Sequence, residues 1–234
     1  MRRIFRLATF FFLAVAVGCA SAVPKPSARG IALGAEDAAG VWTLADDENA
    51  AFDVRLSPKG TAVSNWSKGN ASARGERGRW AIVDGRIVID YDDGWRDIVF
   101  RNEAGAFRKM SYAPGMAHDG PSRGESTALR TPKAVSDWVG VYQVPVAESR
   151  MGREFFVSIQ STHLAWKSID DVRVGSWWIS GDALRIRWAN GWLDELRYIG
   201  PGYQVRSWRP ATVFDAAGNP AEPPTNTGGA RRAE

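Results

Sequence analysis

The chain has 234 residues, which is enough for one large domain or two small ones. Its formal net charge is +4, and no run of lysine and arginine lies within a known nucleic-acid-binding motif, so a nucleic-acid partner is not expected. Because the chain holds one cysteine, no internal disulfide can form and any fold must be stabilised by its core alone. Eleven tryptophans indicate aromatic-packed sheets or an aromatic binding face.

The N-terminus has the layout of a secretory signal. Three arginines in the first six residues precede an apolar run at 7–17, and small residues surround Cys19. The apolar run is too short to span a bilayer, which needs about 20 residues. Residues 16–19, Ala-Val-Gly-Cys, resemble the lipobox of bacterial lipoproteins, in which the cysteine is acylated and becomes the mature N-terminus.

The lipobox resemblance implies lipid attachment at Cys19 and a place in the bacterial cell envelope. Ala20 after the cysteine resembles an outer-membrane sorting signal, so we expect the periplasmic face of the outer membrane. An alternative stays open, because residues 20–22, Ala-Ser-Ala, are also a small-x-small cleavage site and cutting after Ala22 would release a soluble secreted or periplasmic protein. Either cleavage removes the three arginines and lowers the formal net charge from +4 to +1.

The chain contains an internal duplication. Residues 87–97, IVIDYDDGWRD, match residues 184–194, LRIRWANGWLD, and Gly-Val-Trp at 40–42 is echoed by Gly-Val-Tyr at 140–142. These matches keep their order and spacing through both halves, which indicates two copies of one β-rich unit.

The segments outside the two copies are rich in Pro, Gly, Ser, Ala, Asn or Thr, which is typical of linkers and of disorder. The sequence therefore predicts a signal (1–19), a flexible tether (20–37), a first β-repeat (38–114), a linker (115–136), a second β-repeat (137–210) and a disordered tail (211–234).

Within each repeat, apolar residues alternate with polar ones in short runs separated by Gly, Pro, Asn and Asp. This period of two predicts an all-β fold, with six or seven short antiparallel strands in each repeat. We expect two small barrel-like or sandwich units side by side. The alternative is one larger closed barrel built from both repeats, since closure removes exposed edges.

One hairpin in each repeat can be placed in register. A three-residue loop at 189–191, with Gly191 left-handed, gathers the apolar residues on one face, whereas a two-residue loop mixes them with arginines. We therefore predict the three-residue loop. The shared face then carries Leu184, Ile186, Trp188, Trp192, Asp194 and Leu196 in the second repeat, and Ile87, Ile89, Tyr91, Trp95, Asp97 and Val99 in the first.

This register turns Asp97 and Asp194 into apolar faces. A buried carboxylate is costly unless it is hydrogen-bonded or paired, so each one either pins the sheet or forms the polar bottom of a ligand cavity. We expect the second repeat to carry any binding, because its hairpin has more aromatic residues. The predicted ligand-binding residues are Tyr91, Trp95, Asp97, Trp188, Trp192 and Asp194.

Other motifs do not indicate catalysis or metal binding. The aspartates before Gly94 are not followed by the acidic residue that an EF-hand needs at its twelfth position, and two lone histidines do not make a zinc site. There is no nucleophile elbow and no phosphate-binding glycine loop. We therefore expect no enzymatic activity, no catalytic residue, no metal and no cofactor.

The opening Gly40-x-Trp42, followed by an antiparallel meander, resembles the start of lipocalin-like, or calycin, barrels. The second repeat keeps Gly140 but has Tyr142, and neither half shows that family's Thr-Asp-Tyr turn or the arginine that closes its barrel. The resemblance implies non-enzymatic binding of small apolar molecules in a barrel mouth. We expect an envelope lipoprotein whose β-repeats bind a small or lipidic ligand or cell-wall glycan; the alternative is a protein-binding, inhibitory or structural envelope lipoprotein.

Overall fold

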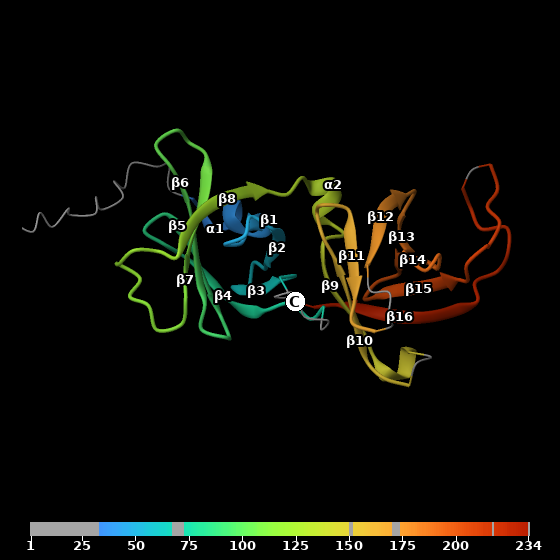
Figure 1. Cartoon of the computed structure of the whole chain (residues 1–234). Coiled ribbons are helices and arrows are strands. Elements are labelled where there is room, and N and C mark those ends of the chain that lie inside the picture. Colours follow the sequence, from blue (N-terminus) through green and yellow to red (C-terminus); the bar gives the residue numbers. More distant parts are fainter. Residues whose placement is uncertain (1–32, 67–72, 150–151, 170–173, 217, 234) are drawn as a thin grey trace, which may run out of the picture.

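The structure is a computed structural model that describes residues 33–66, 73–149, 152–169, 174–216 and 218–233. The predicted signal, Cys19 and most of the predicted tether lie outside these residues. The described residues form two closed antiparallel barrels of eight strands each, which lie side by side (Figure 1). The predicted all-β fold with two tandem units is confirmed, and the alternative of one larger barrel is wrong.

Barrel 1 follows the chain from blue to green in Figure 1, and each strand pairs with the next until β8 returns to β1. Its strands are β1 (Gly40–Ala45), β2 (Ala51–Leu56), β3 (Thr61–Ser64), β4 (Arg77–Val83), β5 (Arg86–Tyr91), β6 (Arg96–Arg101), β7 (Phe107–Tyr112) and β8 (Gly124–Arg130).

Barrel 2 repeats this topology from yellow to red, with β16 returning to β9. A short 3₁₀ helix, η1 (Val146–Glu148), follows its first strand. Its strands are β9 (Gly140–Val144), β10 (Phe155–Ile159), β11 (Leu164–Lys167), β12 (Val174–Ser180), β13 (Ala183–Trp188), β14 (Leu193–Tyr198), β15 (Tyr203–Trp208) and β16 (Asn226–Arg232).

The closing strand of each barrel corrects the sequence prediction. β8 lies within the predicted linker at 115–136, and β16 lies within the tail predicted to be disordered at 211–234, so both predictions and the count of six or seven strands are wrong. Each closing strand turns only one buried side chain into the core, Ala128 or Ala230. Each closing strand instead forms backbone hydrogen bonds with a strand on either side, which is how closure removes an edge.

A short helix precedes the first strand of each barrel and covers one barrel end: α1 (Ala35–Ala38) and α2 (Lys133–Ser136). Trp42 Nε1 donates to the Ala38 carbonyl at 2.8 Å, and Tyr142 Oη donates to the Trp138 carbonyl at 2.6 Å. The aromatic residue of each Gly-x-aromatic motif therefore fills the interior at this end of its barrel. It also forms a hydrogen bond to the segment that precedes the first strand. No helix among the described residues has the length and apolar character needed to cross a membrane.

An arginine ends each closing strand at this same barrel end. The Arg130 guanidinium lies 5.3 Å from the Trp42 ring centroid and donates to the Ala38 carbonyl at 2.9 Å. Arg232 likewise donates to the Asp137 carbonyl at 2.7 Å. A Cβ at Gly40, where φ is +126°, would come within 2.5 Å of the Arg130 guanidinium, so glycine is required there. An arginine at the end of the closing strand therefore contacts the segment before the first strand in both barrels.

The predicted hairpin register is confirmed in both barrels. Ile186 pairs with Asp194, and Ile89 pairs with Asp97. Each three-residue loop has its glycine at positive φ, +87° at Gly191 and +89° in the first copy. Since the register decides which side chains face the interior, it also places both aspartates on the inner face.

The two barrels pack through the outer faces of their first strands. Asp53 is buried there, and it accepts hydrogen bonds from Thr43 Oγ1 at 2.8 Å, Asn65 Nδ2 at 3.0 Å and the Ser161 backbone N–H at 2.9 Å. The last of these bonds crosses from barrel 2 to barrel 1. A small apolar cluster accompanies it, consisting of Val63, Ala73, Val141, Phe156 and Ala233.

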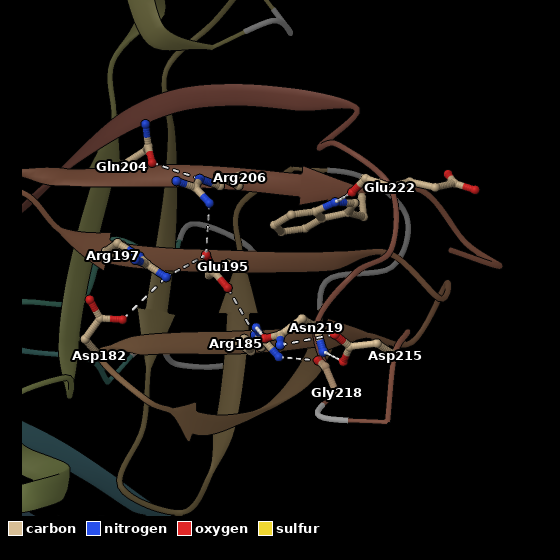
Figure 2. A network of polar contacts seen from close by, with 11 residues as sticks. Asp182, Arg185, Glu195, Arg197, Gln204, Arg206, Asp215, Gly218, Asn219 and Glu222 are labelled. Carbon is tan, nitrogen blue, oxygen red and sulfur yellow. Dashed lines mark hydrogen bonds and ion pairs between the residues drawn. The ribbon is translucent and has the colours of Figure 1, made fainter. Parts of the chain in front are cut away.

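A second buried carboxylate also belongs to an outer face. Glu195 on β14 forms ion pairs with Arg185 at 3.1 Å and with Arg197 and Arg206 at 3.8 Å each (Figure 2). Arg185 in turn donates to the Gly218 carbonyl and to Asn219 (Figure 2), so the chain after β15 folds over this network and holds it. Because side chains alternate along a strand, Glu195 faces away from the interior that Asp194 faces.

Candidate ligand cavities

Each barrel has a cavity at the end opposite its helix. Cavity 1, in barrel 1, has a volume of about 190 Å³, and cavity 2, in barrel 2, has a volume of about 180 Å³. The loops that join β1 to β2 and β5 to β6 contribute to the mouth of cavity 1, and the equivalent loops of barrel 2 contribute to cavity 2. The two cavities therefore occupy the same place in the two repeats.

Five of the six residues predicted to bind a ligand line these cavities. Tyr91, Trp95 and Asp97 line cavity 1, and Trp192 and Asp194 line cavity 2. The sixth, Trp188, is fully buried in the core of barrel 2 and does not line the cavity. Its Nε1 donates to Asp194 Oδ2 at 2.6 Å, as Tyr91 Oη donates to Asp97 Oδ2 at 3.2 Å in the first copy. The tyrosine and the tryptophan thus hold the equivalent aspartates in the same way.

The floor of cavity 1 is a buried network around Asp97. Its carboxylate accepts from Ser111 Oγ at 2.8 Å and from Tyr91 Oη, and it lies 3.6 Å from Lys109 Nζ. Asp97 is 4% exposed and Lys109 is 3% exposed, so this ion pair lies below the solvent-facing wall. A buried carboxylate with a cation and two hydroxyl donors has its charge compensated, which is the condition for keeping it in an interior.

Burial and hydrogen bonding shift two pKa values at this floor. Burial raises the pKa of Asp97, against the opposing effects of Lys109, Ser111 and Tyr91. Burial, followed by the neighbouring Asp97 carboxylate, raises the pKa of Tyr91 well above its usual value. Tyr91 therefore keeps its proton and acts as a hydrogen-bond donor.

Asp97→Asn is expected to flatten the pH dependence of stability. Because the folded-state pKa of Asp97 lies above the unfolded value near 3.8, the folded state binds this proton more tightly. The wild type should lose the associated stability as pH rises from about that value through the raised folded pKa, and the variant should not. Urea unfolding at a series of pH values measures this. Asp92→Asn, at an exposed turn residue, is the matched control, and identical profiles for Asp97→Asn and wild type would contradict the expectation.

Each floor combines an aspartate, a serine and a lysine, but the lysine comes from different strands. Cavity 1 has Asp97, Ser111 and Lys109, and cavity 2 has Asp194, Ser207 and Lys167. Lys109 lies on β7, where barrel 2 has Val205, and Lys167 lies on β11, where barrel 1 has Ser64. Sequence comparison of the repeats missed both lysines because they do not align. The alternation of Phe107, Lys109 and Ser111 on one face of β7 is the signal that could have found the first.

The wall of cavity 1 is aromatic, formed by Phe52, Trp66, Tyr91 and Trp95. Polar contacts fix two of these rings. Trp66 Nε1 donates to Asp46 Oδ2 at 3.2 Å, and the Arg123 guanidinium lies 5.8 Å from the Trp95 ring centroid. Cavity 2 has two aromatic residues in its lining, Phe155 and Trp192. The aromatic lining therefore favours barrel 1 as the binding unit, whereas the hairpin composition pointed to barrel 2.

No protein-family model matches this chain, and no curated protein or solved structure is significantly similar to it. Within the described ranges, no three His, Cys, Asp or Glu side chains gather as metal ligands would.

Proposed function

We propose that this chain is a non-enzymatic lipoprotein of the bacterial cell envelope that binds a small polar ligand in cavity 1. The observation that carries the proposal is the buried pair of Asp97 and Lys109 at the bottom of an aromatic-walled cavity. Small-molecule sites are typically apolar concavities with a few convergent polar groups, and cavity 1 has that composition. The envelope location and the lipid at Cys19 rest on the N-terminal sequence alone.

The size of the cavities limits the ligand. A cavity of about 150 Å³ holds a benzene molecule, so about 190 Å³ accommodates roughly six to ten non-hydrogen atoms. A long acyl chain exceeds this volume. The size therefore favours a small molecule, or one group of a larger glycan, over a whole lipid.

The covered end of barrel 1 supports the lipocalin-like interpretation. Gly40, Trp42 and Arg130 meet beneath α1, and the cavity opens at the other end. That arrangement agrees with what the resemblance implies, namely a scaffold closed at one end with a ligand in the opposite mouth.

Trp95→Ala is expected to abolish the ligand-induced change in tryptophan fluorescence of the mature chain, from Ala20 onward. The ring lines cavity 1, so its removal eliminates both a contact and a reporter. The titration uses small amines, carboxylates, sugars, muropeptides and phospholipid. Trp166→Ala, on the outer face of β11, is the control and should keep the response. A saturable response that survives Trp95→Ala would place the ligand elsewhere.

The alternative, a protein-binding envelope lipoprotein, has one favourable observation. Leu164 and Trp166 on β11 both expose large apolar surface to solvent on the outside of barrel 2. Exposed apolar residues that lie together mark interaction sites more often than isolated ones do. If that alternative is correct, Trp166→Ala should abolish chemical cross-linking of the protein to an envelope protein and should leave the binding of small ligands unchanged.

A further inference from the structure

Two residues of the cavity 1 wall lie beside the contact between the barrels. Phe52 and Trp66 line the cavity, and their ring centroids are 6.4 Å apart. Asp53 follows Phe52 on β2, and Asn65 precedes Trp66 just beyond the end of β3. Asp53 and Asn65 are buried where barrel 2 contacts barrel 1, with exposed fractions of 2% and 3%. Because neighbouring side chains on a strand point to opposite faces, Phe52 faces the cavity while Asp53 faces barrel 2.

Asn65 binds the chain to β2 just after β3 ends. Its Oδ1 accepts from the Asp53 N–H at 2.6 Å, and its Nδ2 donates to Asp53 Oδ2 at 3.0 Å. The Asn65 N–H also donates to the Asp53 carbonyl at 2.9 Å, and we call these three bonds the clamp. Trp66 is the next residue, and the Nε1 of its ring donates to Asp46 Oδ2. The clamp therefore fixes the backbone from which the Trp66 ring reaches the cavity wall.

The β10–β11 turn of barrel 2 completes the clamp. The Ser161 N–H donates to Asp53 Oδ2 at 2.9 Å, and Asn65 Nδ2 donates to the Ile159 carbonyl at 3.2 Å. Ser161 Oγ also lies 3.0 Å from Thr43 Oγ1, which donates to the other oxygen of Asp53. Since a buried carboxylate or amide is costly unless hydrogen bonds satisfy it, barrel 2 contributes to holding both side chains in this position.

Barrel 2 has a simpler form of the clamp. The strand register places Phe156 where barrel 1 has Asp53. It places Ser168 where barrel 1 has Asn65, and the Phe156 N–H donates to Ser168 Oγ at 2.9 Å. A hydroxyl thus takes the place of the amide, and a phenyl ring takes the place of the carboxylate. The carboxylate and the amide that bind the other barrel belong to barrel 1, whose cavity has the aromatic wall.

We propose that Asp53 and Asn65 are positioning residues for ligand binding, through which barrel 2 holds the Trp66 part of the cavity 1 wall in place. This inference rests on the proposed function for the binding itself. It gives barrel 2 a role that requires no ligand in cavity 2, because its turn orders the wall of cavity 1 before a ligand arrives. A wall that is already ordered loses less conformational entropy on binding, so loss of this support should weaken binding.

Ser161→Pro breaks the support from barrel 2 and keeps the turn that provides it. Ser161 is the second residue of the hydrogen-bonded turn at 160–163, and the equivalent turn of barrel 1 has Pro58 at this position. Proline removes the N–H from which Asp53 accepts and places a ring carbon where that hydrogen lies. Thr162→Ala, at the exposed next residue of the same turn, is the matched control.

Asn65→Ser tests the clamp from the side of barrel 1, since barrel 2 has serine at the equivalent position. A serine hydroxyl accepts a backbone N–H there, as Ser168 does, but the bonds to Asp53 Oδ2 and to the Ile159 carbonyl are lost. Ser168→Ala removes the equivalent bond of barrel 2 and is the matched control. Asn65→Ser removes no backbone donor, so it gives the same measurements if Ser161→Pro fails to fold.

Fluorine NMR of the mature chain labelled with 5-fluorotryptophan reports on the Trp66 ring without any ligand. Trp66→Phe and Trp192→Phe assign the two resonances of interest by removing them. We expect Ser161→Pro and Asn65→Ser to shift and broaden the Trp66 resonance and to leave the Trp192 resonance of cavity 2 unchanged. Both control variants should give the wild-type spectrum. A loss of stability alone would not change one resonance of the folded state selectively.

Ligand binding is measured by fluorescence titration with propylammonium, butyrate and N-acetylglucosamine as probes. Ser161→Pro and Asn65→Ser should weaken the binding of any probe whose response depends on Trp95 by about three- to tenfold, which is the effect of having to order one side chain on binding. Thr162→Ala and Ser168→Ala should bind that probe as the wild type does.

The outcomes separate this proposal from the proposed function. A changed Trp66 resonance together with weaker binding of a Trp95-dependent probe supports both. An unchanged Trp66 resonance in both test variants, or unchanged probe binding, overturns the positioning role and leaves the binding function standing. No Trp95-dependent response of the wild type to any probe, here or in the wider ligand panel, overturns the binding function and the positioning role that rests on it.

Discussion

Trp42→Ala is expected to lower the free energy of unfolding of barrel 1 by about 3–5 kcal/mol. The Trp42 side chain is 1% exposed, and its ring meets the ring of Phe107 edge-on with centroids 4.8 Å apart. The substitution leaves a cavity in the covered end of the barrel, removes the donor to the Ala38 carbonyl and leaves Arg130 without the ring beneath it. Three elements, α1, β1 and β8, lose their common contact.

Urea unfolding followed by far-UV circular dichroism measures this effect, and two variants interpret it. Trp42→Phe keeps an aromatic ring but not the N–H. It should therefore lower the free energy of unfolding less than Trp42→Ala does, because it leaves a smaller cavity in the core. Leu129→Ala changes an exposed residue on β8 and should stay within about 0.5 kcal/mol of wild type. A Trp42→Ala variant as stable as Leu129→Ala would show that the covered end does not stabilise the barrel.

The fold was largely predictable where side chains carry the pattern. Alternation and a glycine at the third loop position were enough to place the hairpin of each repeat in its register, and that register turned Asp97 and Asp194 inward. The internal sequence repeat then predicted that the chain forms two units of the same fold. These features depend on residues that are neighbours in sequence or across one hairpin, so they can be recognised in a single sequence.

The closing strands were not predictable in the same way. β16 reads Asn-Thr-Gly-Gly-Ala-Arg-Arg, which has one apolar side chain, and the usual association of such composition with disorder led to the wrong prediction. In a closed barrel, the strand is held by hydrogen bonds to both neighbours, and Gly228 packs against the Glu148 backbone, where a Cβ would come within 2.5 Å of its carbonyl oxygen. Backbone pairing across many residues of sequence leaves little trace in composition.

The candidate site shows the same division. Tyr91, Trp95 and Asp97 belong to one hairpin, and the sequence identified all three. Lys109 reaches Asp97 from β7, which is adjacent, but a lysine that the other repeat lacks carries no repeat signal. Phe52 on β2 and Trp66, which follows β3, complete the aromatic wall from parts of the chain that are distant in sequence from this hairpin. The polar floor was therefore half predicted.

Ala230→Asp is expected to destabilise barrel 2 by about 3–5 kcal/mol. Ala230 is buried in the core of barrel 2, where it pairs with Tyr203 across the closing ladder. A carboxylate at this position would enter an apolar cluster, and the strand that carries it could not stay paired with both β15 and β9 without burying the charge. Release of β16 would reopen the barrel and expose two strand edges, so aggregation should accompany the loss of stability.

The control for this prediction is Ala221→Asp, which places the same charge on an exposed residue nine positions earlier. If residues 211–234 were disordered, both substitutions would leave the urea unfolding midpoint and the hydrogen-exchange protection of β9 and β15 at wild-type values. If β16 closes the barrel, Ala230→Asp alone lowers the midpoint and removes protection from both neighbouring strands. The two substitutions should thus differ in their effect on stability and hydrogen exchange only if β16 is a paired strand and not a disordered tail. That pairing is made by the backbone, so the composition of the segment does not reveal it.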